Sequence, residues 1–312
     1  MKAALGRMNG PLLGAIFVVG ASVLWGTTGT AATFAPSVSP LAIGAVAMGV
    51  GGLLQALCAV QPIASHWVSL RGRWLLVIMG AAAVAVYPLA FYSSMRLAGV
   101  ALGTVVSIGS APLASAVIER LAERKVLTRR WMLGALLGVA GAGLLSFAGG
   151  SAERPGALAG SWAVPAGTVL GLVAGVTYAL YSWAAHRLIS GGVPSRAAMG
   201  AVFGLGGLLL MPVLAMTGRP LLESWTNFTV GAYMALVPMF AGYVLFGWGL
   251  ARVRPSTATG LSLMETVVAA VLAVVVVGER LPAAGWLGVV MVLASLFVLT
   301  PREPVRPGQG IR

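Results

Sequence analysis

Long apolar runs separated by short polar segments occupy most of the chain. A helix that crosses a membrane needs about 20 predominantly apolar residues, and ten runs are close to that length. They are residues 11–34, 38–60, 73–96, 98–119, 130–149, 163–188, 195–217, 226–251, 255–277 and 283–300. The pattern predicts an all-α integral membrane protein with ten transmembrane helices. The first run is too long for a signal peptide and further spans follow it closely, so we expect it to stay uncleaved.

The two halves of the chain resemble each other. Residues 14–25 read GAIFVVGASVLW and residues 167–178 read GTVLGLVAGVTY, and further local matches follow in the same order at an offset of about 155 residues. Self-similarity at half the chain length indicates a duplicated unit. Each unit holds five spans, an odd number, so the second unit enters the membrane from the opposite side. The sequence therefore predicts two inverted five-helix repeats, an arrangement that recurs in secondary transporters.

The repeat sets the expected domain boundaries. An N-terminal segment at 1–10 precedes the first repeat at 11–149, and a loop at 150–162 precedes the second repeat at 163–300. The tail at 301–312 is rich in Pro, Gly and Arg, a composition typical of disorder.

Basic residues collect in alternate loops. Of the 20 Lys and Arg, only Arg96, Arg154, Arg219 and Arg280 fall in one set of loops, and the other 16 fall in the set that includes both termini. Cytoplasmic loops carry the excess of positive charge in membrane proteins, so we expect both termini in the cytoplasm. The same distribution explains the net charge of +13 without a nucleic-acid partner, because the basic residues lie between spans and form no single patch.

Composition agrees with a membrane location and leaves little for catalysis. Hydrophobic residues make up 59% of the chain and charged residues 9%, against about 25% charged residues in soluble domains. Two His, one Cys and seven acidic residues, all Glu, offer no disulfide framework and no zinc-ligand cluster. We therefore expect no cofactor, no metal and no catalytic residue. The excess of Arg over Lys and the abundance of Ala and Gly suggest a bacterial genome, and hence the inner membrane.

Glu265 is the one acidic residue predicted to lie deep within a span. It follows Pro255 by ten residues, which places it near the middle of the ninth span. A charged carboxylate there costs roughly 3 kcal/mol, so it should face a cavity or a partner. It can bind a substrate ammonium group or carry a coupling proton; the structural alternative is a protonated carboxyl that bridges helices. Glu119 and Glu279 lie near span ends, where we expect water to reach them.

Tyr and Trp side chains also occur at mid-span levels, where the interfacial aromatic belt does not explain them. They are Trp25, Tyr87, Tyr92, Tyr178, Tyr181, Trp183, Tyr243 and Trp248. Their polar atoms need partners, which favours a hydrated cavity over lipid, while helix packing explains any single one equally well. Ser107 and Ser110 of the fourth span are further candidates for contact with a solute, with helix packing as the alternative. Together with Glu265, these side chains form the predicted substrate cavity.

Ten spans in two related halves resemble the EamA branch of the drug/metabolite transporter superfamily. The resemblance covers roughly residues 11–300 and also rests on Leu-Trp-Gly at 24–26 and on Glu-Arg at 123–124 and 279–280. The second half carries the family's full Gly-Glu-Arg-Leu pattern, whereas Ala122 replaces its glycine in the first half. The resemblance implies a basket of ten helices around a central cavity, with spans five and ten at the periphery. The substrates it implies are amino acids, other metabolites, sugar phosphates and cationic drugs.

Amino-acid export is the function that these features favour, with aromatic or bulky apolar substrates preferred. Mid-membrane aromatic rings with one acid suit a zwitterion with an apolar side chain, and no span carries a well-buried Lys or Arg to bind a sugar phosphate. Efflux of lipophilic cations, held by cation–π contacts and Glu265, is the first alternative. An intramembrane enzyme is the second, and the lack of a nucleophile–base pattern argues against it. The expected partners are a small-molecule substrate and the lipid bilayer; the sequence leaves the oligomeric state open.

Overall fold

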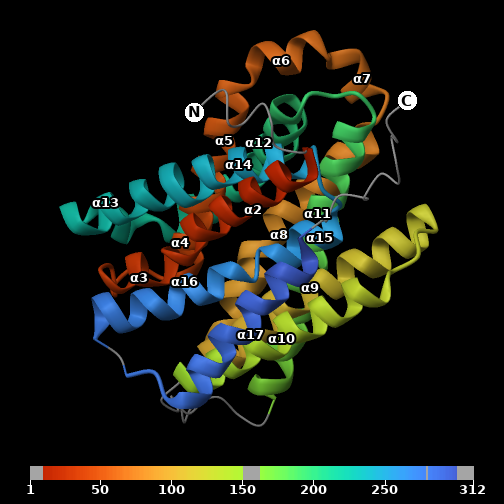
Figure 1. The fold of residues 1–312 in the computed structure, drawn as a ribbon. Coiled ribbons are helices and arrows are strands. Elements are labelled where there is room, and N and C mark those ends of the chain that lie inside the picture. The colour runs from red at the N-terminus through yellow and green to blue at the C-terminus, as the bar shows by residue number, and fades with distance from the viewer. Residues whose placement is uncertain (1–9, 150–161, 279, 301–312) are drawn as a thin grey trace, which may run out of the picture.

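Helices account for most of the residues in the computed structural model, which describes residues 10–149, 162–278 and 280–300 (Figure 1). The first half contains α2 (Gly10–Gly26), α3 (Thr28–Thr33), α4 (Pro40–Gly44), the π-helical segment η1 (Ala45–Val50), α5 (Gly51–Cys58), α6 (Val60–Ser65), α7 (Trp67–Arg71), α8 (Trp74–Ala98), α9 (Val100–Glu123) and α10 (Arg129–Gly149). The second half contains α11 (Ala163–Ser190), α12 (Ser195–Thr217), the 3₁₀ turn η2 (Arg219–Leu222), α13 (Trp225–Met234), the π-helical segment η3 (Ala235–Ala241), α14 (Gly242–Leu250), α15 (Pro255–Leu261), α16 (Met264–Leu272), the π-helical segment η4 (Ala273–Val277) and α17 (Ala283–Leu299).

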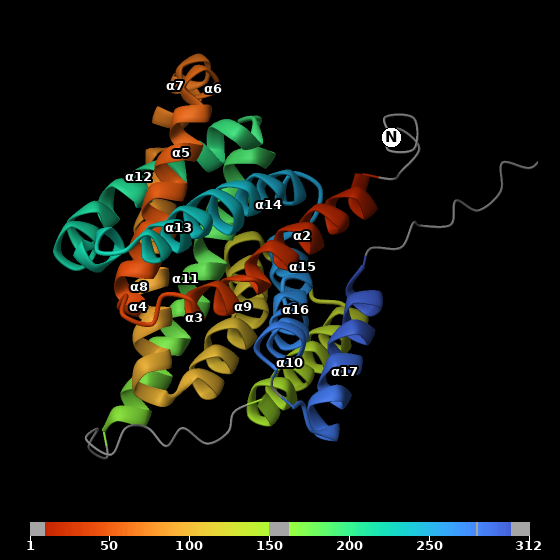
Figure 2. The ribbon, with the colours of Figure 1, turned by 90° about the vertical axis from the view of Figure 1, so that its left-hand side faces the viewer.

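The predicted spans are all helical. Within the described ranges, nine helical stretches are long and apolar enough to cross a membrane, and α17 adds a shorter apolar helix of 17 residues. At 1.5 Å per residue α17 is about 25 Å long, somewhat less than the hydrocarbon core of about 30 Å. The all-helical membrane fold is thus confirmed. The short helices α6 and α7, which the pattern did not predict, stand beyond the spans at one end of the molecule (Figures 1 and 2).

Each span of the first half packs against a span of the second. The packed pairs are α2 with α14, α5 with α12, α8 with α11, α9 with α15, and α10 with α17. If the spans are numbered one to ten along the chain, spans one to five of the first half correspond to spans six to ten of the second. The pair α2–α14 is then spans one and eight, and exchanging the halves turns it into spans six and three, which are α11 and α8. The other three pairs join corresponding spans, so exchanging the halves leaves them unchanged. The two halves therefore hold equivalent places in one interleaved bundle, with α10 and α17 together at one edge (Figure 2).

Glycines allow the paired helices to come into backbone contact. A Cβ added at Gly52 of α5 would lie 2.2 Å from the carbonyl oxygen of Phe203 in α12. Gly141 and Gly288 face each other in the same way, because a Cβ added at either one would lie 2.8 or 2.6 Å from the carbonyl oxygen of the other. Lipid tails provide no hydrophobic drive for helix association, so close packing of this kind has to hold the halves together.

Candidate functional site

The ninth span is interrupted where it carries its acidic residue. The break between α15 and α16 leaves Glu265 in the first turn of α16. Hydroxyl groups around the break bond to nearby backbone: Ser262 Oγ donates to the Thr259 carbonyl at 2.9 Å, and Thr266 Oγ1 donates to the Leu263 carbonyl at 2.7 Å. Such local bonds compete with helical ones. Glu265 therefore lies where the backbone of this span is interrupted.

Aromatic rings from several spans meet in one buried cluster. The ring centre of Trp25 lies 4.8 Å from that of Tyr243 and 6.3 Å from that of Tyr178. Trp25 Nε1 donates to the carbonyl of Pro238, within η3, at 3.0 Å. The hydroxyls of Tyr181 and Tyr243 lie 2.8 Å apart and share a hydrogen bond. The cluster thus joins the first, sixth and eighth spans at one level.

Tyr87 brings the third span to this cluster. Its ring centre lies 5.7 Å from that of Tyr178 and 5.9 Å from that of Tyr181. On its other side it stacks on Phe91 at 5.7 Å, and Phe91 contacts Tyr92 at 5.2 Å. The aromatic surface therefore continues along α8, away from Trp25.

Glu265 lies at the edge of the aromatic cluster. Its carboxyl lies within electrostatic range of the hydroxyls of Tyr87, Tyr92, Tyr178 and Tyr243. Among the described residues, its side chain makes no hydrogen bond, and neither of the two ion pairs includes it. The buried hydroxyl of Tyr178 makes no hydrogen bond of regular geometry there, although the side chain of Ser262 lies beside it. A carboxylate that can accept and a hydroxyl that can donate are thus available to the two ends of a zwitterion.

Ser107 and Ser110 lie against Gly175 of α11. A Cβ added at Gly175 would lie 2.7 Å from the Ser107 carbonyl oxygen and would collide with Ser110 Oγ. Ser110 Oγ donates to the Ser107 carbonyl at 3.3 Å, while Ser107 Oγ is buried without a partner among the described atoms. Both serines therefore occupy a helix contact in this structure.

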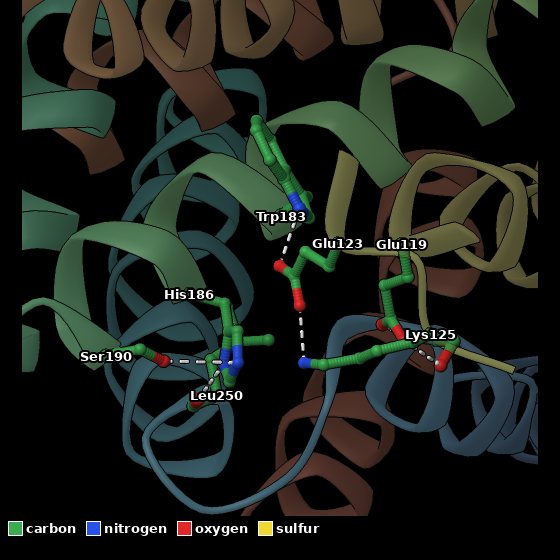
Figure 3. Close-up of polar contacts among 8 residues, drawn as sticks. Glu119, Glu123, Lys125, Trp183, His186, Ser190 and Leu250 are labelled. Carbon is green, nitrogen blue, oxygen red and sulfur yellow. Dashed lines mark hydrogen bonds and ion pairs between the residues drawn. The ribbon is translucent and has the colours of Figure 1, made fainter. Parts of the chain in front are cut away.

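Two of the predicted cavity residues lie apart from the cluster. Trp248 is 37% exposed on the outer face of α14 and packs edge-on against Phe17 with ring centres 5.3 Å apart. Trp183 lies toward the end of α11, where its Nε1 donates to Glu123 Oε1 at 3.0 Å (Figure 3). The residues that the structure does bring together are Trp25, Tyr87, Tyr178, Tyr181 and Tyr243, with Glu265 and Tyr92 beside them.

A buried carboxylate links the two halves at the end of the bundle nearest Gly10. Glu119 of α9 accepts a hydrogen bond from the backbone N–H of Ser256 at 2.8 Å and one from the Ser256 hydroxyl at 3.1 Å. Only 1% of Glu119 is exposed. The expectation that water reaches this residue is therefore wrong, because the start of α15 covers it.

Further polar contacts join α9, α11 and α14 at this end (Figure 3). Glu123 forms an ion pair with Lys125. His186 Nδ1 lies 2.7 Å from the Leu250 carbonyl, which can only accept, so Nδ1 carries the proton. Nε2 of a neutral ring then accepts from the Ser190 hydroxyl at 3.2 Å. These contacts connect the helices at the end of the bundle near Gly10, and sequence reasoning did not identify them.

Comparison with known proteins places this architecture in context. Residues 12–147 and residues 165–300 each match the model of the EamA-like transporter family. The chain is similar to the uncharacterized transporter YwfM of Bacillus subtilis (strain 168), with 32% identity over 294 residues that cover 92% of this chain and 94% of the relative. A solved crystal structure superposes with a TM-score of 0.70 at 19% identity and covers 92% of this chain and 96% of that chain. The last likeness concerns the fold alone.

Proposed function

Because the chain belongs to the EamA-like transporter family, we propose that it is a secondary transporter that exports small metabolites by alternating access. Amino acids with aromatic or bulky apolar side chains are the substrates that the site favours. In this proposal the transporter lies in a bacterial inner membrane with both termini in the cytoplasm, as the distribution of basic residues favours.

The carboxyl of Glu265 carries the proposal. It lies at the start of a half-helix within a span, beside an aromatic cluster, and has no ion-pair or hydrogen-bond partner among the described residues. Discontinuous helices at mid-membrane are recurring substrate or ion sites in secondary transporters, and an intramembrane acid without a partner needs a function. A substrate ammonium group supplies the missing cation, and the neighbouring rings supply a surface for an apolar side chain.

The other end of an amino acid needs hydrogen-bond donors. The Tyr178 hydroxyl makes no hydrogen bond of regular geometry within the described structure; it lies beside the Ser262 side chain and within range of the Glu265 charge, so it can turn to donate to a bound carboxylate. Trp25 Nε1 is already bonded to Pro238, so it holds its ring in place and does not serve the solute. A single hydroxyl suits one carboxylate but not a phosphate dianion, which requires Lys or Arg.

Alternating access follows from the exchangeable halves. The contacts of Glu119 and His186 close the end near Gly10, and these contacts come from spans four, six, eight and nine. The corresponding spans of the other half are nine, one, three and four. In the opposite state of the transport cycle, in which the end near Gly10 is open, these four spans can close the other end of the bundle. In this proposal, the structure represents the state that is closed on the cytoplasmic side.

Counterflow in proteoliposomes tests the proposal. Liposomes loaded with unlabelled phenylalanine should take up labelled phenylalanine, and Glu265→Gln should raise the half-saturating concentration roughly 5- to 10-fold, because it replaces a charge-assisted hydrogen bond by a neutral one. Gln keeps the shape of Glu and removes only the charge. Glu223→Gln is the matched control, because Glu223 is exposed at the far end of the bundle. If instead Glu265 carries a coupling proton, gradient-driven accumulation is lost while exchange persists.

Wild-type rates of Glu265→Gln in both uptake and counterflow, at several phenylalanine concentrations, would contradict either role. Efflux of lipophilic cations remains the second candidate, because aromatic faces and one carboxylate also suit a cation. Phenylethylammonium, which is phenylalanine without its carboxylate, distinguishes the two. An amino-acid transporter should exchange it far more slowly than phenylalanine, and a cation transporter should prefer it.

A further inference from the structure

Gln55 of α5 is a buried amide that the proposed transport function does not yet use. Only 3% of the residue is exposed, and neither Oε1 nor Nε2 has a hydrogen-bond partner among the described residues. An amide offers an oxygen that accepts and two N–H groups that donate, and burying these groups without partners costs more than a typical hydrogen bond gains. An unfilled side chain of this kind inside a membrane bundle requires an explanation.

Packing does not require an amide at this position. The Gly-Gly-Leu-Leu sequence at 51–54 recurs at 206–209, so the residue that corresponds to Gln55 in the second half is Leu210. Leu210 is fully buried on α12, the helix that corresponds to α5. An apolar side chain of similar size therefore fills the same place in the repeat. The two polar atoms of Gln55 are what distinguishes the first half, and a ligand can supply their partner.

The register of α5 against α12 places Gln55 beside the aromatic cluster. A Cβ added at Gly52 would lie 2.2 Å from the Phe203 carbonyl oxygen, and one added at Gly200 would lie 3.1 Å from the Gln55 carbonyl oxygen. The backbone of Gln55 therefore lies beside the turn of α12 between Gly200 and Phe203. The Phe203 ring belongs to the cluster, because its centre lies 4.4 Å from that of Tyr243.

Contacts with the eighth span give the same level. The second and eighth spans both run toward the end near Gly10, and a Cβ added at Gly51 would lie 2.8 Å from Met239 Cβ. Gln55 follows Gly51 by four residues, about one turn. Tyr243 follows Met239 by the same interval, so it lies at the level of Gln55. On α5, Gln55 stands between the face of Gly51 and the face that meets α12, so its side chain points between α12 and the eighth span.

Glu265 lies farther from the end near Gly10 than Gln55 does. A Cβ added at Gly26 would lie 2.7 Å from the Glu265 carbonyl oxygen, and Trp25 bonds to the eighth span one residue before that span meets α5. Gln55 lies one turn beyond that meeting point, so its backbone and that of Glu265 are about one turn, or 5 Å, apart along the bundle. The aromatic cluster thus extends from the carboxyl to the amide.

These two polar groups suit the two ends of one aromatic substrate. The carboxylate binds an ammonium group, and the amide binds a neutral group that can donate to Oε1 or accept from Nε2. Tyrosine carries its hydroxyl at the opposite end of the ring from its ammonium group, whereas phenylalanine has no group that can fill the amide.

We propose that Gln55 binds the ring hydroxyl of a phenolic substrate and so makes the transporter prefer tyrosine to phenylalanine. The inference rests on the proposed transport function and deepens it, because it selects one member of the class of aromatic amino acids.

Counterflow with two substrates tests the assignment. In the wild type, the half-saturating concentration of tyrosine should be roughly 3- to 10-fold below that of phenylalanine, as one neutral hydrogen bond provides. Gln55→Leu should bring the two values within about twofold of each other. Gln61→Leu is the matched control, because Gln61 is exposed on α6, and it should keep the preference. No preference in the wild type, or an unchanged preference in Gln55→Leu, would overturn the proposal.

Thermal melting without substrate gives a readout that does not require transport. Because the substitution removes an amide that has no partner, Gln55→Leu should raise the melting temperature in detergent by about 2 to 4 °C. Gln61→Leu should leave it unchanged. A lower melting temperature in Gln55→Leu would overturn the proposal, because the amide would then have a partner within the protein.

The role of Gln55 and the transport function fail separately. Exchange of phenylalanine without a preference for tyrosine would refute only the role of Gln55. If neither amino acid is exchanged, melting with tyramine, which is phenylethylammonium with a ring hydroxyl, decides the matter. A larger stabilisation by tyramine than by phenylethylammonium, lost in Gln55→Leu, would retain the hydroxyl site, and equal stabilisation would refute it.

Discussion

The buried contact between Glu119 and Ser256 should hold the end of the bundle near Gly10 closed, and Glu119→Gln should loosen it. The carboxylate accepts two hydrogen bonds, at 2.8 and 3.1 Å, and 1% of the residue is exposed. Gln can keep both contacts through its oxygen and its amide group, but each becomes neutral. Charged bonds exceed neutral ones by about 1 kcal/mol each, so the closed state should lose about 2 kcal/mol, or about 30-fold in its equilibrium with an open state.

A thiol placed beneath this contact reports the change. Ser115 lies one turn before Glu119 on α9, is fully buried, and accepts a hydrogen bond from Thr259 Oγ1 of α15 at 3.1 Å. In a Cys58→Ser background, N-ethylmaleimide should label Ser115→Cys slowly, and Glu119→Gln should raise the rate by about 30-fold, in line with the shift in the equilibrium. Glu223→Gln, the same change at an exposed residue, should leave the rate unchanged. An unchanged rate in Glu119→Gln would refute the reasoning that this contact controls opening.

Two further substitutions test the packing. Tyr243→Phe removes the hydrogen bond to Tyr181 and should lower the free energy of unfolding by about 1 kcal/mol, measured by thermal melting in detergent. Tyr87→Phe is the control, because the Tyr87 hydroxyl makes no hydrogen bond among the described residues; equal shifts would contradict the assignment. Gly52→Val drives a side chain into a backbone carbonyl of α12 and should abolish monodisperse protein in size-exclusion chromatography, whereas Gly29→Ala meets open space and should be tolerated. A well-behaved Gly52→Val protein would show that α5 and α12 separate easily.

Span positions were predictable because a bilayer demands long apolar helices whatever their neighbours are. The depth of Glu265 follows from the same demand, since any acid in the middle of such a run lies in the membrane. The break beside it was not predicted, because Ser262 and Thr266 are common in continuous membrane helices and reveal a break only through their bonds to the backbone.

Side-chain direction was harder to predict. Trp248 and Tyr243 lie on the same helix, but Tyr243 enters the cluster while Trp248 faces outward. In a soluble protein the outer face would be polar and would reveal the difference, but lipid accepts apolar residues on every face. Burial of Glu119 was missed for a related reason. Its partner, Ser256, lies in the other half of the chain, and only the pairing of α9 with α15 brings the two together.

Interleaving of the two halves has a consequence for biosynthesis. Ser256 is translated 137 residues after Glu119, which at about 5 to 20 residues per second takes roughly 7 to 30 seconds. For most of that interval the first five helices are already made, while the helices of the second half that they pack against are still being synthesised. The nascent chain must therefore wait with a carboxyl and several glycine faces uncovered, so slow translation or premature termination within the second half should send the product to quality-control proteolysis.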